Sequence, residues 1–281
     1  MTEQHSSWAS LEKDLEQLLG LRGQAVGIKV VKDGYTISSD ARKPSKQIDL
    51  CQLYQMARFH SITSYAEKED IFCSRGSSAL GLEPVPSDII EGERDETGKA
   101  PDIDAAKFLQ MNIPRLPLTE GYRGVVIFPL SDASVDPDVI VLTGNPAQML
   151  RLCQATTFKR SGQRLRFQTS GTQALCADCI ATVKLTNEPN MTTPCYGARY
   201  FAYFEDNEMM FAMPPEYVKG VVEGLKTTHE GGYPYPILHE YEVTPSDSAS
   251  LTIARTVPEG AKHGDEITHV KSGSKRHEKS D

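Results

Sequence analysis

"DPDVIVLTGNPAQMLRLCQAT", residues 136–156, places a strand pattern directly before a helix pattern. The run 136–144 is typical of a strand, because its apolar and β-branched residues are bounded by turn-forming ones. Asn145 suits a helix N-cap, and Pro146 suits the first helical position, where the missing N–H has no helical partner in any case. We therefore predict a strand over 136–144 that runs directly into a helix over 145–156.

The segments on either side repeat these two patterns without strict alternation. Strands and helices that mix in this way, rather than as βαβ units, indicate the α+β class. We predict mixed or antiparallel sheets with flanking helices in one compact domain. Strands are expected at 25–31, 121–130, 200–206 and 208–214, the last two paired through the turn at Asp206-Asn207, and helices at 49–60, 172–185 and 215–228.

The domain is expected to carry a helix at its start and an extension at its end. Residues 1–24 predict an N-terminal amphipathic helix that begins near Ser7. The α+β domain follows over 25–228, with a polar insertion at about 83–120 whose first part, 83–104, has the composition of a surface loop or lid. The C-terminal extension, 229–281, ends in polar residues that are expected to be disordered. The apolar side of the first helix comprises Trp8, Leu11, Leu15, Leu18 and Leu19.

Two similar stretches indicate that the domain consists of two pseudo-repeated halves. "FCSRGSSALGL" (72–82) and "PCYGARYFAYF" (194–204) each place a cysteine before small residues. Each follows a helical cysteine, Cys51 in the first half and Cys176 in the second. Each half then has a strand that leads into a proline-started helix, "VIVLTGNPAQMLRL" and "MMFAMPPEYVKGVV". A pseudo-two-fold axis would bring the equivalent cysteines together.

The composition disfavours several classes of function. The net charge of −8 and the pI of about 5.5 disfavour nucleic-acid binding, because phosphates repel an acidic protein. No apolar run approaches the length of a membrane-spanning helix, and the N-terminus lacks the pattern of a secretory signal. We therefore expect a cytoplasmic protein whose six cysteines are free thiols, metal ligands or catalytic thiols rather than disulfides.

Four cysteines, Cys51, Cys73, Cys176 and Cys195, are candidate ligands of one metal centre. Thiolates bind zinc, and they hold [2Fe–2S] and [4Fe–4S] clusters. Four cysteines from separate elements suit a cluster, with [4Fe–4S] as the expected form, better than zinc, which commonly uses two Cys-x₂₋₄-Cys knuckles. Gly76 would let the backbone approach a ligand sulfur closely.

The remaining cysteines leave two alternatives open. Cys179 is an alternative ligand to Cys176, and the Cys-x₂-Cys pair that they form is also a candidate redox dithiol. Cysteines also pack as small hydrophobic residues, so the protein is alternatively a metal-free module that binds a small molecule. Cys153 is expected in the core.

Four polar residues are candidates for binding or catalysis. Arg75 and Arg199 follow the paired cysteines, and a guanidinium binds carboxylate or phosphate with two hydrogen bonds. Glu208 and Tyr196 are weaker catalytic candidates, as a carboxylate and a proton donor. Each has a structural alternative: an ion pair for the arginines, a solvated turn for Glu208 and packing for Tyr196.

The order of these motifs resembles that of the uncharacterised ArCR family, also called domain of unknown function 169. The motifs are "AVGIKVV", "LCQLYQMA", "FCSRGSSALGL", "VIVLTGNPAQMLRL" and "PCYGARYFAYFEDNEMMFAMP", and the resemblance covers about residues 10–228. It implies family cysteines at positions like Cys51, Cys73 and Cys195, with one near Cys176, and it carries no settled activity.

Together these patterns predict an iron–sulfur protein with redox or Lewis-acid chemistry on a small anionic molecule. Such a protein would be an oxidoreductase or a lyase-type enzyme. An electron-transfer partner and a homodimer are the expected associations, with no nucleic acid and no membrane.

Overall fold

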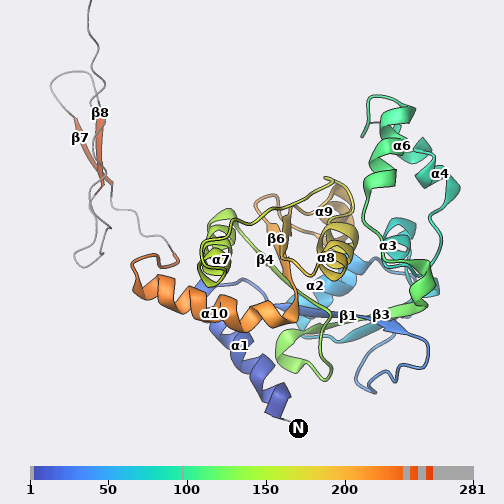
Figure 1. Ribbon diagram of the computed structural model, residues 1–281, viewed down its shortest axis with the longest axis horizontal. Helices are drawn as coiled ribbons and strands as arrows, with labels where there is room; N and C mark the ends of the chain where they lie inside the picture. Colours follow the sequence, from blue (N-terminus) through green and yellow to red (C-terminus); the bar gives the residue numbers. More distant parts are fainter. Residues whose placement is uncertain (1–2, 97, 237–240, 246–250, 256–281) are drawn as a thin grey trace, which may run out of the picture. The chain divides into compact units, whose positions relative to one another are not determined.

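The computed structural model describes residues 3–96, 98–236, 241–245 and 251–255, which belong to two compact units. The first unit, residues 1–238, has a six-stranded sheet with helices on both faces (Figure 1). In the second unit, residues 239–281, strands β7 (Tyr241–Pro245) and β8 (Leu251–Arg255) pair antiparallel. The end of the chain, for which the sequence predicts disorder, lies outside the described residues.

All neighbouring strands of the large sheet are antiparallel, in the order β2-β3-β1-β4-β6-β5. The predicted α+β class is therefore confirmed. Within the described ranges, no helix combines the length and apolar character needed to cross a bilayer. The strands are β1 (Val26–Lys32), β2 (Ser64–Glu67), β3 (Tyr122–Pro129), β4 (Val139–Gly144), β5 (Asn190–Thr192) and β6 (Met209–Met213).

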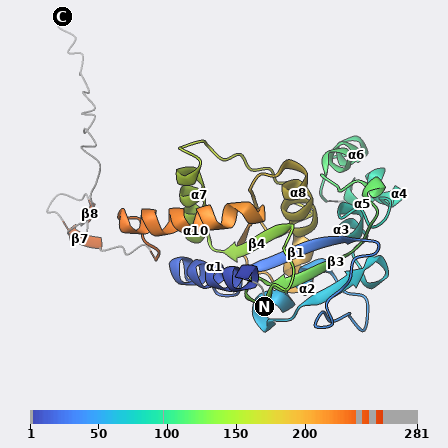
Figure 2. The same cartoon turned by 60° about the horizontal axis from the view of Figure 1, so that its bottom comes forward.

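Three long helices cover one face of the sheet: α1 (Glu3–Leu19), α7 (Pro146–Lys159) and α10 (Pro215–Glu230). They enclose an apolar core with alternate residues of β4 and β6, such as Ile140 and Phe211. Both views place α10 alongside α1 (Figures 1 and 2). All three helices were predicted from the sequence, and α1 buries Leu15 and Leu19 as predicted.

The predicted start of α7 is confirmed in its details. The Asn145 side-chain oxygen accepts hydrogen bonds from the backbone N–H groups of Ala147 and Gln148, each at 3.0 Å. The Gln148 carboxamide oxygen accepts in return from the N–H of Asn145 at 2.7 Å. This reciprocal cap satisfies amides that a helix start leaves unpaired. The Gln148 amide also donates to the backbone oxygen of Leu19 at 2.9 Å, which joins α7 to the end of α1.

The opposite face of the sheet carries the helices that contain the candidate cysteines. They pack against inward residues of the central strands, including Ile28, Ile127 and Val141. These helices are α2 (Leu50–His60), α3 (Ser74–Ala79), the π-helix η4 (Ala174–Ala181), α8 (Thr182–Thr186) and α9 (Tyr196–Ala202). Three short 3₁₀ turns complete the elements: η1 (Lys68–Asp70), η2 (Leu118–Glu120) and η3 (Leu130–Asp132).

The strand order is symmetric about the central pair β1 and β4. Outward from this pair, β3 and then β2 lie on one side, and β6 and then β5 lie on the other. In chain order, each half has a central strand, a helix with a cysteine, a short edge strand, a helix capped by a cysteine and a middle strand. At the centre Gly27 pairs with Ile140, flanked by Val26 opposite Val141. The two halves are thus related by a pseudo-two-fold axis.

One part of the predicted correspondence between the halves is wrong. The sequence aligned "VIVLTGNPAQMLRL" with "MMFAMPPEYVKGVV", which are β4 with α7 and β6 with α10. In the sheet, β4 corresponds to β1, and β6 corresponds to β3. Both segments contain a strand followed by a helix that begins with proline. This arrangement is common, and it produced the false match.

The predicted strand over 200–206 is also wrong, because residues 196–202 form α9. Ala198 and Ala202 are buried at helical spacing, and the helix ends at Tyr203, whose φ is 55°. The many aromatic residues of the segment favour a strand by propensity, but Tyr200 and Tyr203 are exposed. The partner segment does form a strand, β6, which pairs with β4 and β5 instead.

The composition of the polar stretch 83–104 suggested a surface loop, but the stretch is largely helical. It contains α4 (Ser87–Ile90), α5 (Glu93–Glu96) and the start of α6 (Ile103–Asn112), which form a small helical group (Figure 1). These helices enclose the buried side chains of Ile89, Asp95 and Ala106. Because these helices pack around a buried carboxylate, their sequence lacks the apolar periodicity that predicts a helix.

Candidate functional site

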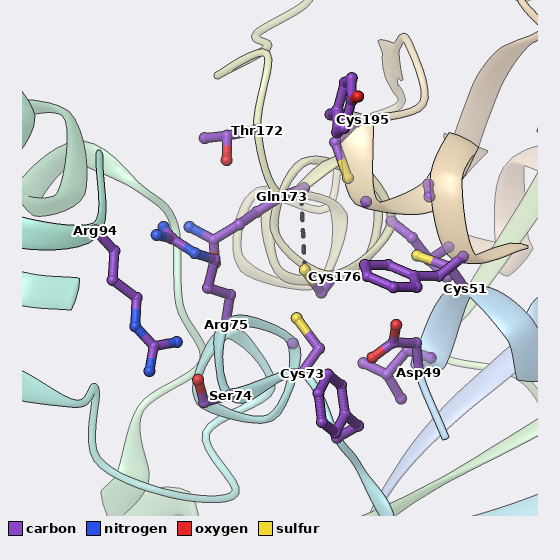
Figure 3. Close-up of a pocket in the computed structure, with 18 of the residues that line it drawn as sticks. Asp49, Cys51, Cys73, Ser74, Arg75, Arg94, Thr172, Gln173, Cys176 and Cys195 are labelled. Atoms are coloured by element: carbon purple, nitrogen blue, oxygen red, sulfur yellow. Dashed lines mark hydrogen bonds between the residues drawn. The ribbon is translucent and has the colours of Figure 1, made fainter. Parts of the chain in front are cut away.

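The four candidate cysteines line one cavity of about 530 Å³ (Figure 3). Cys51 comes from α2, Cys73 from the start of α3, Cys176 from the π-helix η4 and Cys195 from the start of α9. Their sulfurs point into the same space (Figure 3). The pseudo-two-fold arrangement therefore brings together the cysteines that it was expected to bring together.

Cys73 and Cys195 occupy the N-cap positions of two short helices. The Cys73 side chain makes no capping hydrogen bond, and the N–H of Gly76 donates to the Cys73 backbone oxygen at 2.9 Å. A Cβ at residue 76 would lie 3.1 Å from Leu50 Cδ1, so the close packing of α3 on α2 favours glycine there. The predicted approach of the Gly76 backbone to a ligand sulfur stays a prediction.

Cys51 and Cys176 lie near the starts of α2 and η4, the corresponding helices of the two halves. Cys51 is the second residue of α2, and the Cys176 thiol donates to the backbone oxygen of Gln173 at 3.7 Å. All residues of the π-helix Ala174–Ala181 are buried. The π-helical turns are rare and often mark functional sites, because the wider turn changes where a side chain points.

Burial and mutual proximity control the ionisation of these thiols. Burial raises the pKa of Cys51 and Cys176 well above the ordinary thiol value, and the neighbouring cysteine charges raise it further. Burial also raises the pKa of Cys73, although the nearby backbone amides of Gly76 and Arg75 oppose the rise. These thiols are therefore protonated at neutral pH in the metal-free protein. A metal that binds them must displace their protons.

The thiols that line the cavity do not form the ligand shell of a single metal ion. In the part of the chain that the structure describes, no three or more His, Cys, Asp or Glu side chains are grouped so as to hold one metal ion. A tetrahedral zinc site would require the four thiols to draw together around one atom. An iron–sulfur cluster places several iron and sulfide atoms between its thiolates, and thiols spread around a cavity match that requirement.

Cys179 and Cys153 stand apart from the cavity. Cys179 is fully buried in the π-helix, and burial raises its pKa well above the ordinary value. A redox dithiol needs an accessible thiol with a lowered pKa, and the Cys176–Cys179 pair has the opposite properties. Cys153 packs against the core of the other face, as predicted, and burial raises its pKa to about 11.

Asp49 and Gln173 line the cavity and were not identified from the sequence. They are the N-cap residues of α2 and η4, the corresponding helices of the two halves. Asp49 Oδ1 and both side-chain polar atoms of Gln173 are buried without a hydrogen-bond partner among the described residues. Burial raises the pKa of Asp49, although the nearby Cys73 backbone amide opposes the rise. A polar residue shortly before a helical cysteine is the only sequence signal that could have indicated them.

The two arginines predicted to bind substrate have different surroundings. Arg75 lines the cavity, and its guanidinium donates to both carboxylate oxygens of Asp95 at 2.9 and 3.0 Å. Arg199 is not among the lining residues. It donates to the backbone oxygens of Pro194 and Glu205 at the two ends of its own helix. The structure thus brings Arg75 to the cysteines and leaves Arg199 outside the cavity.

The two weaker catalytic candidates are also separated. Tyr196 lies at the cavity with 79% of its surface exposed, and its ring stacks on Tyr200 with centroids 6.3 Å apart. Glu208 is buried away from the cavity, where Arg58 donates to its carboxylate at 2.6 Å. Glu208 also accepts from the backbone N–H of Glu205 at 2.9 Å. Its contacts hold the turn before β6 against α2.

The motif order, the fold and the converging cysteines can now be set beside known proteins. The model of the uncharacterised ArCR family, domain of unknown function 169, matches residues 14–224. The chain belongs to this family. An uncharacterized protein of Methanocaldococcus jannaschii is 32% identical over 216 residues, which cover 76% of this chain and 91% of that protein. No solved structure gives a significant match. The ArCR domain thus spans α1 to α10 and includes all four cavity cysteines.

Proposed function

We propose that this ArCR protein holds an iron–sulfur cluster, in the [4Fe–4S] form, through Cys51, Cys73, Cys176 and Cys195, and that it acts on a small anionic molecule. The observation that carries the proposal is the convergence of four thiols from four separate elements on one cavity. Apolar packing alone gives no reason for four cysteines to meet where the two halves meet.

The groups around the thiols support this assignment. The backbone amides of Gly76 and Arg75 lie close enough to the Cys73 thiol to lower its pKa, and amides in such positions favour a ligand thiolate. The bound cluster would supply electron transfer, or a Lewis-acidic iron that polarises a substrate oxygen. Asp49 lies in the same cavity, and burial raises its pKa, so its carboxyl holds a proton more readily than an exposed one does.

The setting that we propose follows from the same chemistry. A thiolate-held cluster is best kept in a reducing compartment, so we place the protein in the cytoplasm. If the chemistry is redox, an electron-transfer partner is needed. We also propose that the protein forms a homodimer. The net charge of −8 opposes nucleic acid as a partner. As a catalyst, the protein would be an oxidoreductase or a lyase-type enzyme.

One observation favours a second candidate, a metal-free module that binds a small molecule. Cys176 is part of the main apolar core, and Cys51 and Cys195 pack against it, as thiols that act only as hydrophobic residues would. In that case a Cys51→Ala/Cys195→Ala double variant would retain its fold and its ligand binding.

Anaerobic purification followed by iron and acid-labile sulfide analysis tests the proposal. We expect about four iron and four sulfide per chain after reconstitution, with a brown colour that dithionite bleaches. Colourless protein without bound iron after reconstitution would overturn the proposal in favour of the metal-free module.

A further inference from the structure

The cavity has a polar side that is distinct from the thiol side. Arg75, Arg94 and Gln173 lie together on one side of the view, and Cys51, Cys73 and Cys195 lie on the other (Figure 3). Lys99, from the helical insertion, also lines the cavity. A substrate next to the thiols would therefore meet cations and an amide.

The carboxamide of Gln173 points to a ligand because it is buried without a partner. The residue is 4% exposed, and neither Oε1 nor Nε2 has a hydrogen-bond partner among the described residues. Buried polar groups are almost always hydrogen-bonded, and each exception calls for an explanation. A bound molecule that both accepts from Nε2 and donates to Oε1 would satisfy the two atoms.

The charges beside Gln173 are not balanced. The fully buried carboxylate of Asp95 faces two cations, Arg75 at 2.9 Å and Lys99 at 3.0 Å. Gln110 donates to the same carboxylate, and Arg115 in turn donates to Gln110 Oε1 at 2.8 Å. One carboxylate between two cations leaves a positive charge, and that charge favours an anionic ligand.

The pseudo-two-fold axis makes the asymmetry of the cavity clear. Asp49 and Gln173 are the N-caps of corresponding helices, yet one is an acid and the other a neutral amide. Arg75 follows Cys73 by two residues, whereas Gly197 follows Cys195 by two. Thus the Gln173 side combines an amide with cations, and the Asp49 side carries an acid. The two halves therefore differ at residues that line the cavity, where a ligand would contact them.

We infer that Gln173, Arg75 and Lys99 form a subsite for a 2-hydroxy- or 2-amino-carboxylate. The carboxylate lies toward the excess positive charge and accepts from Gln173 Nε2. The adjacent hydroxyl or amino group donates to Gln173 Oε1. A plain carboxylate or a fully ionised phosphate ester has no such donor and would leave Oε1 unpaired. The inference rests on the proposed function, because the cluster would occupy the thiol side of the cavity.

Calorimetry with matched acids tests the subsite on metal-free and reconstituted full-length protein. The probes are glycolate, lactate, alaninate and malate against acetate, propionate and succinate. We expect the 2-hydroxy or 2-amino acid of at least one matched set to bind about tenfold or more tightly than its deoxy partner. Gln173→Met should remove this preference, and Lys99→Gln should weaken both members of the set equally.

Matched controls separate the subsite from general effects on the fold. Gln163→Met changes an exposed glutamine outside the cavity, and Lys107→Gln changes a lysine on α6 that pairs with Glu91. Both should bind like the unaltered protein. If Gln173→Met fails to fold, the exposed Lys99→Gln still tests the role of charge.

Two outcomes distinguish this inference from the proposed function. Iron-loaded protein that binds no probe, or binds matched acids equally, overturns the subsite and leaves the cluster intact. Protein that takes up no iron on reconstitution but shows the preference supports the subsite and overturns the cluster.

Discussion

Cys73 and Cys195 occupy equivalent positions in the two halves of the domain, each as the N-cap of the helix that follows a short edge strand. Both line the cavity that also contains Cys51 and Cys176. The symmetry of the fold therefore determines where the thiols meet.

Metal-free protein should lose stability as the pH rises above about 9. Unfolded thiols lose their protons near 9.0, but burial raises the folded pKa of Cys51, Cys176 and Cys179 well above that value and that of Cys153 to about 11. Between the unfolded and folded values the native state binds more protons, so the free energy of unfolding falls with rising pH. Thermal unfolding from pH 8 to 11 should show a decreasing Tm.

Reconstituted protein provides the control for this prediction. Cluster-bound thiolates have no proton to retain, so the decrease in Tm with pH should be smaller in the loaded protein. Equal pH dependence in both forms would show that the cluster is not bound by these thiols.

Cys176 and Cys179 should resist alkylation in the native protein. Cys176 is 8% exposed and Cys179 is 0% exposed, and both have a raised pKa, so neither presents a thiolate to a reagent at neutral pH. After iodoacetamide treatment at pH 7, mass spectrometry should find both cysteines unmodified in the native protein. Both should be modified when the protein is unfolded in urea. Rapid selective modification of either residue would revive the dithiol alternative.

Glu208 should contribute to stability rather than to cluster binding. Its removal would leave the almost fully buried guanidinium of Arg58 without its charged partner. Glu208→Ala should therefore lower the free energy of unfolding by about 3–5 kcal/mol, the range for breaking a buried ion pair. Urea denaturation measures this change, and iron analysis at low temperature measures cluster content.

The matched control is Glu205→Ala, which removes the exposed ion pair with Arg22 in the same turn. It should leave stability nearly unchanged, because exposed pairs contribute little. If Glu208→Ala folds stably but loses iron, Glu208 acts at the cluster and its structural assignment is wrong.

Local chemistry explains why much of the fold was predictable. Asn145 and Pro146 set the start of α7 through hydrogen bonds and a backbone angle that depend only on neighbouring residues. The cysteines Cys73 and Cys195 were paired correctly because both precede small residues that begin a helix.

The errors arose where distant contacts decide the structure. The aromatic residues of α9 favour a strand by propensity, but burial of Ala198 and Ala202 against the core at helical spacing stabilises a helix. Arg75 could be predicted to bind an anion, but its partner Asp95 lies in an insertion without apolar periodicity. Gln173 could not be distinguished from other glutamines, because its buried, unpaired amide exists only in the folded chain.

Iron and sulfide content of cysteine variants, measured with electron paramagnetic resonance after anaerobic reconstitution, tests the central claim most directly. Cys73→Ser and Cys195→Ser should each lose most of the iron and the spectrum of the reduced cluster. Cys153→Ser, a cysteine on α7 outside the cavity, should retain both. If the cavity variants bind as much iron with the same spectrum as Cys153→Ser, the four thiols do not hold a cluster and the account is wrong.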